Sequence, residues 1–209
     1  GARGLKLMLD IVVNHTSIEH EWFQQARSSL DNPYRDFYIW RDQPNNWESK
    51  FGGSAWEYEA QTGQYYLHLF DVTQADLNCA NPKVRAEVYK LMCFWRDKGV
   101  GGFRLDVINL ISKPAHFPQD DSDGRRFYTD GPNVHEYLQE MHREVFAGHD
   151  LVSVGEMSST SLEHCIRYSR PDSQELSMTF NFHHLKVDYP NMQKWLKADF
   201  DFLQLKQIF

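Results

Sequence analysis

Short apolar runs alternate with amphipathic helical patterns over most of the chain, and this alternation limits the possible folds more than any other feature. The runs lie at residues 5–13, 102–108, 151–155 and 177–182, and the helical patterns at 82–98, 132–145 and 161–169. Strand, helix and strand in this order predict parallel βαβ units with right-handed crossovers. We expect the first run to be buried on both faces, as strands of parallel sheets usually are.

Local signals mark the ends of several elements. Ser17 is the predicted cap of a helix that follows the first strand and ends before Pro33. Asn81 is predicted to cap a helix that begins at Pro82, and Gly99 is predicted to end it. The tail from about residue 191 also has a helical pattern.

Residues 31–80 interrupt the alternation. They are rich in aromatic residues and turn formers, and only 64–70, after the turn at Thr62 and Gly63, is predicted to be a strand. We interpret this stretch as an inserted subdomain of irregular structure. The predicted organisation is therefore a catalytic part formed by residues 1–30 and 81–209, with residues 31–80 as the insertion.

Polar residues follow the predicted strands, namely Asn14, His15, Asp106, Glu156, Asn181 and His183. In a (β/α)8 barrel the active site lies at this carboxyl end of the strands. Because a whole barrel takes about 250 residues, we predict an α/β fold that is a partial TIM (β/α)8 barrel of about four βα units with an inserted subdomain. An open doubly wound sheet would have a glycine-rich loop after a strand, whereas Gly99, Gly101 and Gly102 precede theirs.

Composition excludes several classes of partner. The chain has 22 basic and 29 acidic residues, a net charge of −7, which disfavours nucleic acid as a partner. No apolar run approaches the roughly 20 residues that span a bilayer, so we expect no membrane partner. Cys79, Cys93 and Cys165 lie far apart. This spacing is typical of reduced thiols with packing roles in a cytoplasmic protein.

Asp106 and Glu156 are the strongest candidates for chemistry, since each ends an apolar strand. Two carboxyl groups roughly 5–5.5 Å apart are what a retaining glycosidase needs, one as nucleophile and one as general acid and base. Arg104 points the same way as Asp106 along a strand, and would hold it ionised. The alternative is that these carboxylates cap helices or form ordinary ion pairs.

The sequence offers no clear metal site. Asp10, Asn14 and His15 cluster at the end of the first strand, but the spacing of His15 and His20 does not bring both to one helix face. The acidic loop at 120–124 departs from the EF-hand pattern at the first and last ligand positions. We therefore predict no metal in this segment.

Four segments in order resemble conserved segments of the α-amylase family of glycoside hydrolases (family 13). They are Asp10–His15, Gln74–Asn78, Gly102–Val107 and Gly155–Met157. Residues 47–70 also resemble the inserted B domain of that family, so the resemblance covers essentially the whole chain.

The resemblance implies a role for each matching residue. Asp106 matches the nucleophile, Glu156 the general acid and base, and Arg104 the arginine that orients the nucleophile. Asp10 and His15 match residues around the sugar at the cleavage subsite. Asn14 matches a structural residue that also binds calcium in some amylases. The third carboxylate of the family lies in a His-Asp segment further along the chain. The only such pair here, at 149–150, precedes a strand instead of following one, so we expect the third carboxylate to be absent.

Finer resemblances suggest the substrate. Val107 resembles the branch of the family that cleaves α-1,6 linkages of the isomaltose type. The stretches 154–161 and 177–189 look like the branch that cleaves trehalose 6-phosphate. The expected partner is therefore a small phosphorylated disaccharide, with isomaltose-type substrates as the alternative. Two alternatives belong to another class of function: a non-catalytic relative, such as a transporter heavy chain, and a sugar-binding protein.

A phosphorylated sugar needs cationic or amide donors beside the leaving-group subsite. His183, His184 and Lys186 follow a predicted strand and are the first candidates. Arg125 and Arg126 lie on the loop after Asp106 and are the second. The alternative for each is a solvated surface charge. The resemblance implies no cofactor for the reaction, and leaves a calcium site possible elsewhere in the family fold.

The chain begins without an initiator Met and ends in the middle of a helical pattern, which suggests an internal piece of a longer protein. We therefore expect the isolated 209 residues to be inactive and poorly stable, because an incomplete barrel leaves strand edges and apolar helix faces uncovered. A thermal melt and a disaccharide assay check this. A cooperative melt together with measurable hydrolysis would contradict it.

Overall fold

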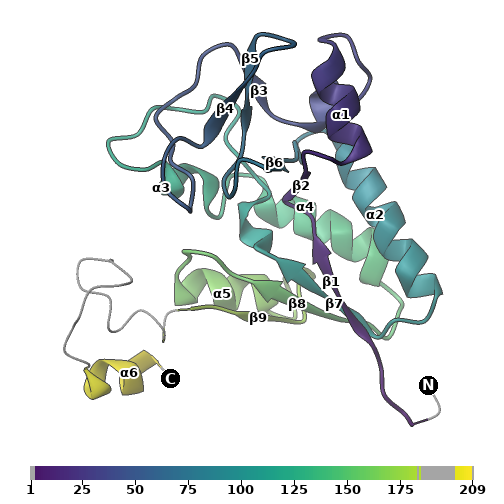
Figure 1. Ribbon diagram of the computed structural model, residues 1–209. Coiled ribbons are helices and arrows are strands. Elements are labelled where there is room, and N and C mark those ends of the chain that lie inside the picture. The colour runs from purple at the N-terminus through teal and green to yellow at the C-terminus, as the bar shows by residue number, and fades with distance from the viewer. Residues whose placement is uncertain (1–2, 183, 185–200, 209) are drawn as a thin grey trace.

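The computed structural model describes residues 3–182, 184 and 201–208. Its centre is a four-stranded parallel sheet in the order β1-β7-β8-β9 (Figure 1). The strands are β1 (Met8–Val12), β7 (Gly102–Asp106), β8 (Val152–Glu156) and β9 (Met178–Phe180). The register sets Asp10 opposite Arg104 and Val12 opposite Asp106. The predicted parallel βαβ order is thus confirmed for these strands.

Helices connect the parallel strands. They are α2 (Pro82–Asp97), α4 (Val134–Met141), which continues into a wider turn at His142–Phe146, and α5 (Leu162–Ser169). Figure 1 shows α2 and α4 side by side, and the Tyr89 hydroxyl donates to the carbonyl oxygen of Tyr137 across their contact at 3.2 Å. The main core lies between these helices and the sheet, with Phe103 and Leu105 fully buried on β7.

The ends of two helices test the predicted caps. The side chain of Asn81 accepts from the amide of Lys83 at 3.0 Å, and Gly99 follows the helix with a left-handed φ of +90°, so both predicted ends of α2 are confirmed. The first helix, α1 (Glu21–Ser28), is capped by His20 and not by Ser17. The reason is that Ser17 belongs to β2 (His15–Ser17), whose pairing with β6 (Gln74–Asp76) keeps the chain extended.

The first strand is not buried on both faces, which corrects the expectation from its apolar sequence. Met8 is 44% exposed and Val12 is 47% exposed. The physical reason is position, because β1 lies at the edge of the four-stranded sheet and β7 is its only partner in the described part of the chain. An apolar run thus predicts that a strand forms, but not how many strands pair with it.

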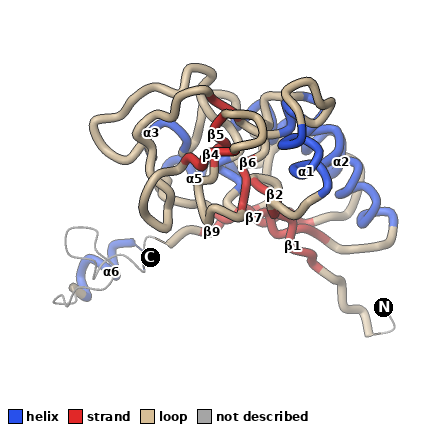
Figure 2. Tube along the Cα trace, turned by 45° about the horizontal axis from the view of Figure 1, so that its top comes forward, coloured by secondary structure: helices blue, strands red, loops and turns tan. Residues whose placement is uncertain are grey.

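The stretch predicted as an insertion contains its own sheet. Strands β3 (Trp40–Arg41), β5 (Gln64–Leu67) and β4 (Trp56–Glu59) form an antiparallel sheet in that order, after a 3-10 turn at Arg35–Phe37. Figure 2 shows this part and its long loops above the parallel sheet. The boundaries at residues 31 and 80 stay a prediction.

A second core joins the antiparallel sheet to the segment after β7. It contains Trp47, Trp56 and Leu67 from the insertion, and Val107, Leu110 and Tyr128 from that segment. The predicted strand at 102–108 ends at Asp106, because Val107 adopts a left-handed φ of 36° and a 3-10 turn follows at Ile108–Leu110. A short helix, α3 (Arg125–Tyr128), interrupts the predicted loop.

The tail contains α6 (Phe202–Ile208), and the rest of the helix predicted from residue 191 lies outside the described residues. Among the described helices, none has both the length and the apolar character needed to cross a membrane.

Gly102 is required by the close approach of two strands. A Cβ atom at this position would lie 2.2 Å from the carbonyl oxygen of Val152 on β8. We expect Gly102→Ala to destabilise the complete protein by about 3 kcal/mol, because the strands must separate. Gly99→Ala, where only the left-handed backbone is strained, is the matched control and should cost about 1 kcal/mol. Urea unfolding measures both, and equal costs would contradict the steric explanation.

Candidate active site

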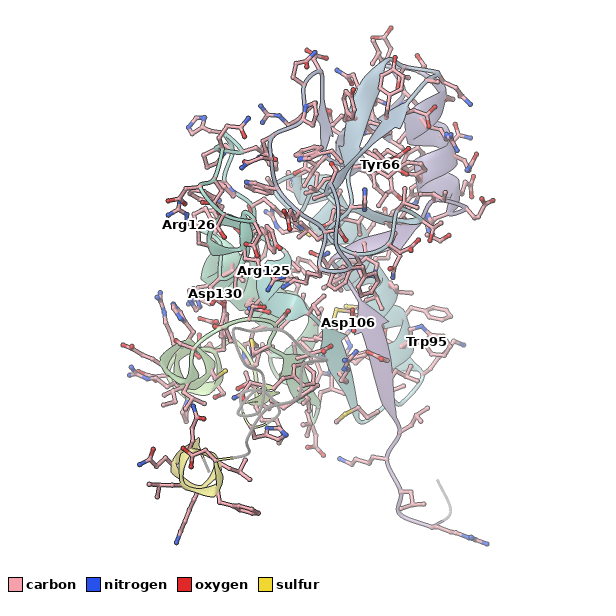
Figure 3. The ribbon with its side chains drawn as sticks, turned by 60° about the vertical axis from the view of Figure 1, so that its left-hand side comes forward. Tyr66, Trp95, Asp106, Arg125, Arg126 and Asp130 are labelled. Atoms are coloured by element: carbon pink, nitrogen blue, oxygen red, sulfur yellow. The ribbon has the colours of Figure 1, made fainter. Side chains whose placement is uncertain are left out.

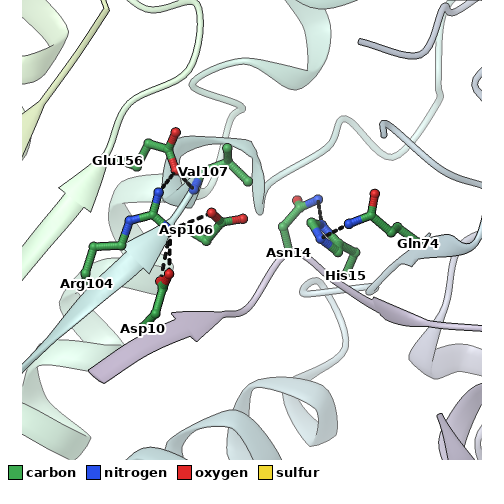
Figure 4. Close-up of polar contacts among 8 residues, drawn as sticks. All are labelled: Asp10, Asn14, His15, Gln74, Arg104, Asp106, Val107 and Glu156. Atoms are coloured by element: carbon green, nitrogen blue, oxygen red, sulfur yellow. Dashed lines mark hydrogen bonds and ion pairs between the residues drawn. The ribbon is translucent and has the colours of Figure 1, made fainter. Parts of the chain in front are cut away.

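The predicted catalytic carboxylates lie at the same edge of the parallel sheet. Asp106 ends β7 and Glu156 ends β8, and these strands are neighbours with parallel register (Figure 4). Asp10 lies on β1, which pairs with β7 on its other side. The ends of neighbouring parallel strands lie together, which places Asp106 beside Glu156, and Asp10 lies opposite Arg104, two residues before the end of β1.

The Arg104 guanidinium binds all three carboxylates. Its Nη1 donates to Asp10 at 2.9 and 3.1 Å and to Asp106 at 2.6 Å, while its Nη2 donates to Glu156. Burial opposes the charged form of Arg104, but the hydrogen bonds that its guanidinium donates to Asp10 and Asp106 raise its pKa. The sequence predicted the contact with Asp106 only. The contact with Glu156 depends on strand order, which the sequence does not state.

Glu156 is the carboxyl group suited to hold a proton. Its side chain is 12% exposed. Burial raises its pKa, and the nearby negative charge of Asp106 adds to this, while the Arg104 cation acts in the opposite direction. A raised pKa keeps a carboxyl group protonated at a higher pH than usual, as a general acid requires. The amide of Val107 also approaches Glu156, at 3.5 Å.

His15 is held beside this edge by neutral partners. The amide nitrogen of Gln74 lies 3.1 Å from its Nε2 and that of Asn14 lies 3.4 Å from its Nδ1 (Figure 4). The ring of Phe70 lies 5.2 Å from its own ring. Burial lowers the pKa of His15, although Asp76 and Asp106 oppose the shift. Burial therefore favours the neutral imidazole, and both of its ring nitrogens face side-chain amides.

A buried ion pair supports the residues around His15. The Lys113 ammonium lies 2.8 Å from the Asp76 carboxylate and donates to the Asn14 side chain at 2.8 Å. The Asp76 carboxylate accepts from the Asn14 side-chain amide at 2.9 Å and from the backbone amide of Leu69 at 2.8 Å. The sequence analysis missed this cluster. In the sequence, only the position of Asp76 inside the Gln74–Asn78 segment pointed to this cluster, and no motif contained Lys113.

Only some of the predicted phosphate-binding residues lie in the described part of the chain. His183 and Lys186 lie outside the described residues, and His184 is half-buried. Arg125 lies 3.0 Å from Asp123, and Arg126 lies 2.5 Å from Asp120 and 2.7 Å from Asp121. Figure 3 shows both arginines on the segment around α3. The acidic residues of their own loop thus pair with these two charges.

The sequence predicted no metal in the acidic loop and packing roles for the cysteines, and the described residues bear on both predictions. There, no group of three or more His, Cys, Asp or Glu side chains has a metal-binding arrangement. In the acidic loop, Asp120 accepts from the amides of Asp121 at 2.9 Å and Gly124 at 2.7 Å, so its carboxylate organises the loop itself. Cys79 and Cys165 are free and buried, as packing residues are.

The fold and this site define the class of protein. The whole chain, residues 1–209, matches the family described as α-amylase, catalytic domain, and the chain belongs to this family. It is 64% identical to the trehalose-6-phosphate hydrolase of Bacillus subtilis (strain 168), over 99% of this chain and 38% of that protein. It is 53% identical to an oligo-1,6-glucosidase of Parageobacillus thermoglucosidasius, over 92% of this chain and 36% of that protein.

A solved structure is equally similar. A crystal structure of a Bacillus licheniformis trehalose-6-phosphate hydrolase variant in complex with PNG matches with a TM-score of 0.97 and 64% identity, over 99% of this chain and 39% of that chain. The resemblance inferred from four sequence segments is thus confirmed. The chain spans less than two fifths of the length of these relatives.

The Lys113 and Asp76 pair gives a prediction for stability. Their side chains are 3% and 0% exposed. We expect Lys113→Met to destabilise the complete protein by about 3–5 kcal/mol, because it leaves a buried carboxylate without its cation. Lys90→Met, which removes an exposed pair with Glu87, is the control and should change little. Urea unfolding measures both, and a neutral Lys113→Met would show that Asp76 does not depend on this cation.

Proposed function

We propose that the complete protein is a retaining glycoside hydrolase that cleaves trehalose 6-phosphate into glucose and glucose 6-phosphate. The observation that carries the chemistry is the meeting of Asp106 and Glu156 at the ends of adjacent strands, with Arg104 bound to both. The choice of substrate rests on the similarity to trehalose-6-phosphate hydrolases. We also propose that the four parallel strands belong to a (β/α)8 barrel and that the protein is cytoplasmic.

In the proposed first step, the Asp106 carboxylate attacks the anomeric carbon while Glu156 gives its proton to the departing glycosidic oxygen. Arg104 orients the nucleophile through its 2.6 Å contact. In the second step, Glu156 takes a proton from water, which attacks the anomeric carbon and releases Asp106. Asp10 and His15 contact the sugar at the cleavage subsite. The two carboxyl groups supply nucleophile and proton, so we propose no cofactor.

The contacts to the phosphate are the finer part of this proposal. We assign them to His183, His184 and Lys186, because the net charge of −7 requires a local source of positive charge. Arg125 and Arg126 are less suitable, since both already pair with acidic side chains. Val107 stays a proposed specificity residue. Its side chain is 6% exposed within the second core, so it would act by shaping the site.

An oligo-1,6-glucosidase that acts on isomaltose is the second candidate. The observation that favours it is the 53% identity to such an enzyme, together with Val107 after the proposed nucleophile. A non-catalytic transporter heavy chain or sugar-binding protein is less consistent with the site. Neither kind of protein would need Asp106 and Glu156 side by side, nor the raised pKa of Glu156.

A substrate comparison tests the function. We expect the complete protein to hydrolyse trehalose 6-phosphate with a higher kcat/KM than isomaltose or unphosphorylated trehalose, because phosphate contacts add binding energy. Asp106→Asn should lower kcat by at least ~10³-fold, since it removes the nucleophile. Release of glucose measures both. Indifference to the phosphate would favour the second candidate, and full turnover by the variant would refute the assignment of Asp106.

Arg104 gives a prediction for pH dependence. The Arg104 cation lowers the pKa of Glu156, so Arg104→Met should raise that pKa further. The acid must be protonated to act, and activity falls as pH rises through its pKa. The alkaline limb of kcat/KM should therefore move to higher pH. Arg170→Met, which removes an exposed pair with Asp172, should leave the limb unchanged. A limb that stays in place in Arg104→Met would contradict the proposed coupling.

A further inference from the structure

Asp130 is a buried carboxylate that the proposed reaction does not use. It precedes α4, its side chain is 9% exposed, and its backbone has a left-handed φ of 51° (Figure 3). Asp tolerates this conformation better than most residues. Its backbone amide donates to the carbonyl oxygen of Asn109 at 3.0 Å, in the turn that follows Asp106. The residue is thus fixed to the loop of the proposed nucleophile.

The Asp130 carboxylate gathers donors from three segments. Its Oδ1 accepts from the Asn109 amide at 3.1 Å and from the Tyr168 hydroxyl on α5 at 2.7 Å, and its Oδ2 accepts from the Thr160 hydroxyl at 2.5 Å. The His164 imidazole lies 3.8 Å from Oδ2. Asn109, Thr160 and Tyr168 are themselves buried. We call Asp130 with these three residues the Asp130 network.

The network continues to the loop that carries the proposed acid. The side chain of Asn109 donates to the carbonyl oxygen of Ser158 at 2.8 Å and accepts from its amide at 2.9 Å. Ser158 and Thr160 follow Glu156 by two and four positions, so the network holds this loop at two points. Ser159 between them has a left-handed φ of 56°, a conformation that persists only where surrounding contacts hold it.

We propose that Asp130 is a positioning residue that sets Glu156 relative to Asp106 by joining the loops that follow them. This inference rests on the proposed function. A displaced general acid slows the departure of a poor leaving group, such as a sugar alkoxide, which needs a proton in the transition state. It scarcely affects p-nitrophenolate, which leaves without one. A defect in positioning is therefore selective for the leaving group, whereas general destabilisation is not.

The test compares two substrates in variants of the complete protein. In Asp130→Ala we expect kcat/KM for the disaccharide that the wild type cleaves best to fall about 10²-fold, as small displacements of catalytic groups do. The kcat/KM for p-nitrophenyl α-glucoside, which covers only the steps up to the departure of p-nitrophenolate, should change little. Asp130→Asn should retain the disaccharide activity, because its amide keeps one acceptor and can donate to Thr160. Asp172→Ala, which removes an exposed carboxylate, is the matched control and should alter neither rate.

Two further measurements keep the test decisive. If Asp130→Ala fails to fold, Thr160→Val removes one hydrogen bond without changing the backbone, and should cost about fivefold on the disaccharide alone. Hydrogen exchange of amides 157–161 should accelerate in either variant. If the wild type cleaves no glycoside, the proposed function fails, and the exchange rates alone decide the Asp130 network. Equal losses on both substrates, an Asp130→Asn variant as impaired as Asp130→Ala, or unchanged exchange would overturn the proposal.

Discussion

One cation between three carboxylates is the interaction on which the site depends. Asp10, Asp106 and Glu156 come from three neighbouring parallel strands and meet at one edge. Carboxylates this close to one another repel. The Arg104 guanidinium, bound to all three, offsets that repulsion and still leaves the pKa of Glu156 raised. The same cation therefore joins three strands at the candidate site and leaves Glu156 as the carboxyl group suited to hold a proton.

A second cation acts in the same way beside this edge. Lys113 and Asp76 are almost completely buried, and they fix Asn14 next to His15. Breaking such a pair is costly because each charge has lost its water. This pair supports Asn14 beside His15, and the Asp130 network supports the loops that follow Asp106 and Glu156. Loops alone would give less rigid support to side chains that must hold a fixed geometry.

The insertion contributes to the site through packing. Trp47 and Leu67 share a core with Val107 and Leu110, which follow the proposed nucleophile by one and four positions. The left-handed turn at Val107 is thus buried beneath the antiparallel sheet. Residues 31–80, the least regular part of the sequence, therefore pack against the left-handed backbone of Val107.

The sequence by itself determined the parallel strands, the caps of α2 and the carboxylates at the strand ends, because these follow from local spacing and composition. The family was identified from the resemblance of four segments to conserved segments of α-amylases. It did not determine that β1 is an edge strand, that Ser17 pairs in β2, or that Lys113 and Asp130 meet their partners. Each of these depends on which distant segments become neighbours: Lys113 contacts a side chain 99 positions away, and Asp130 one 38 positions away. Only the tertiary structure decides such contacts, since burial and pairing act between segments that local patterns describe separately.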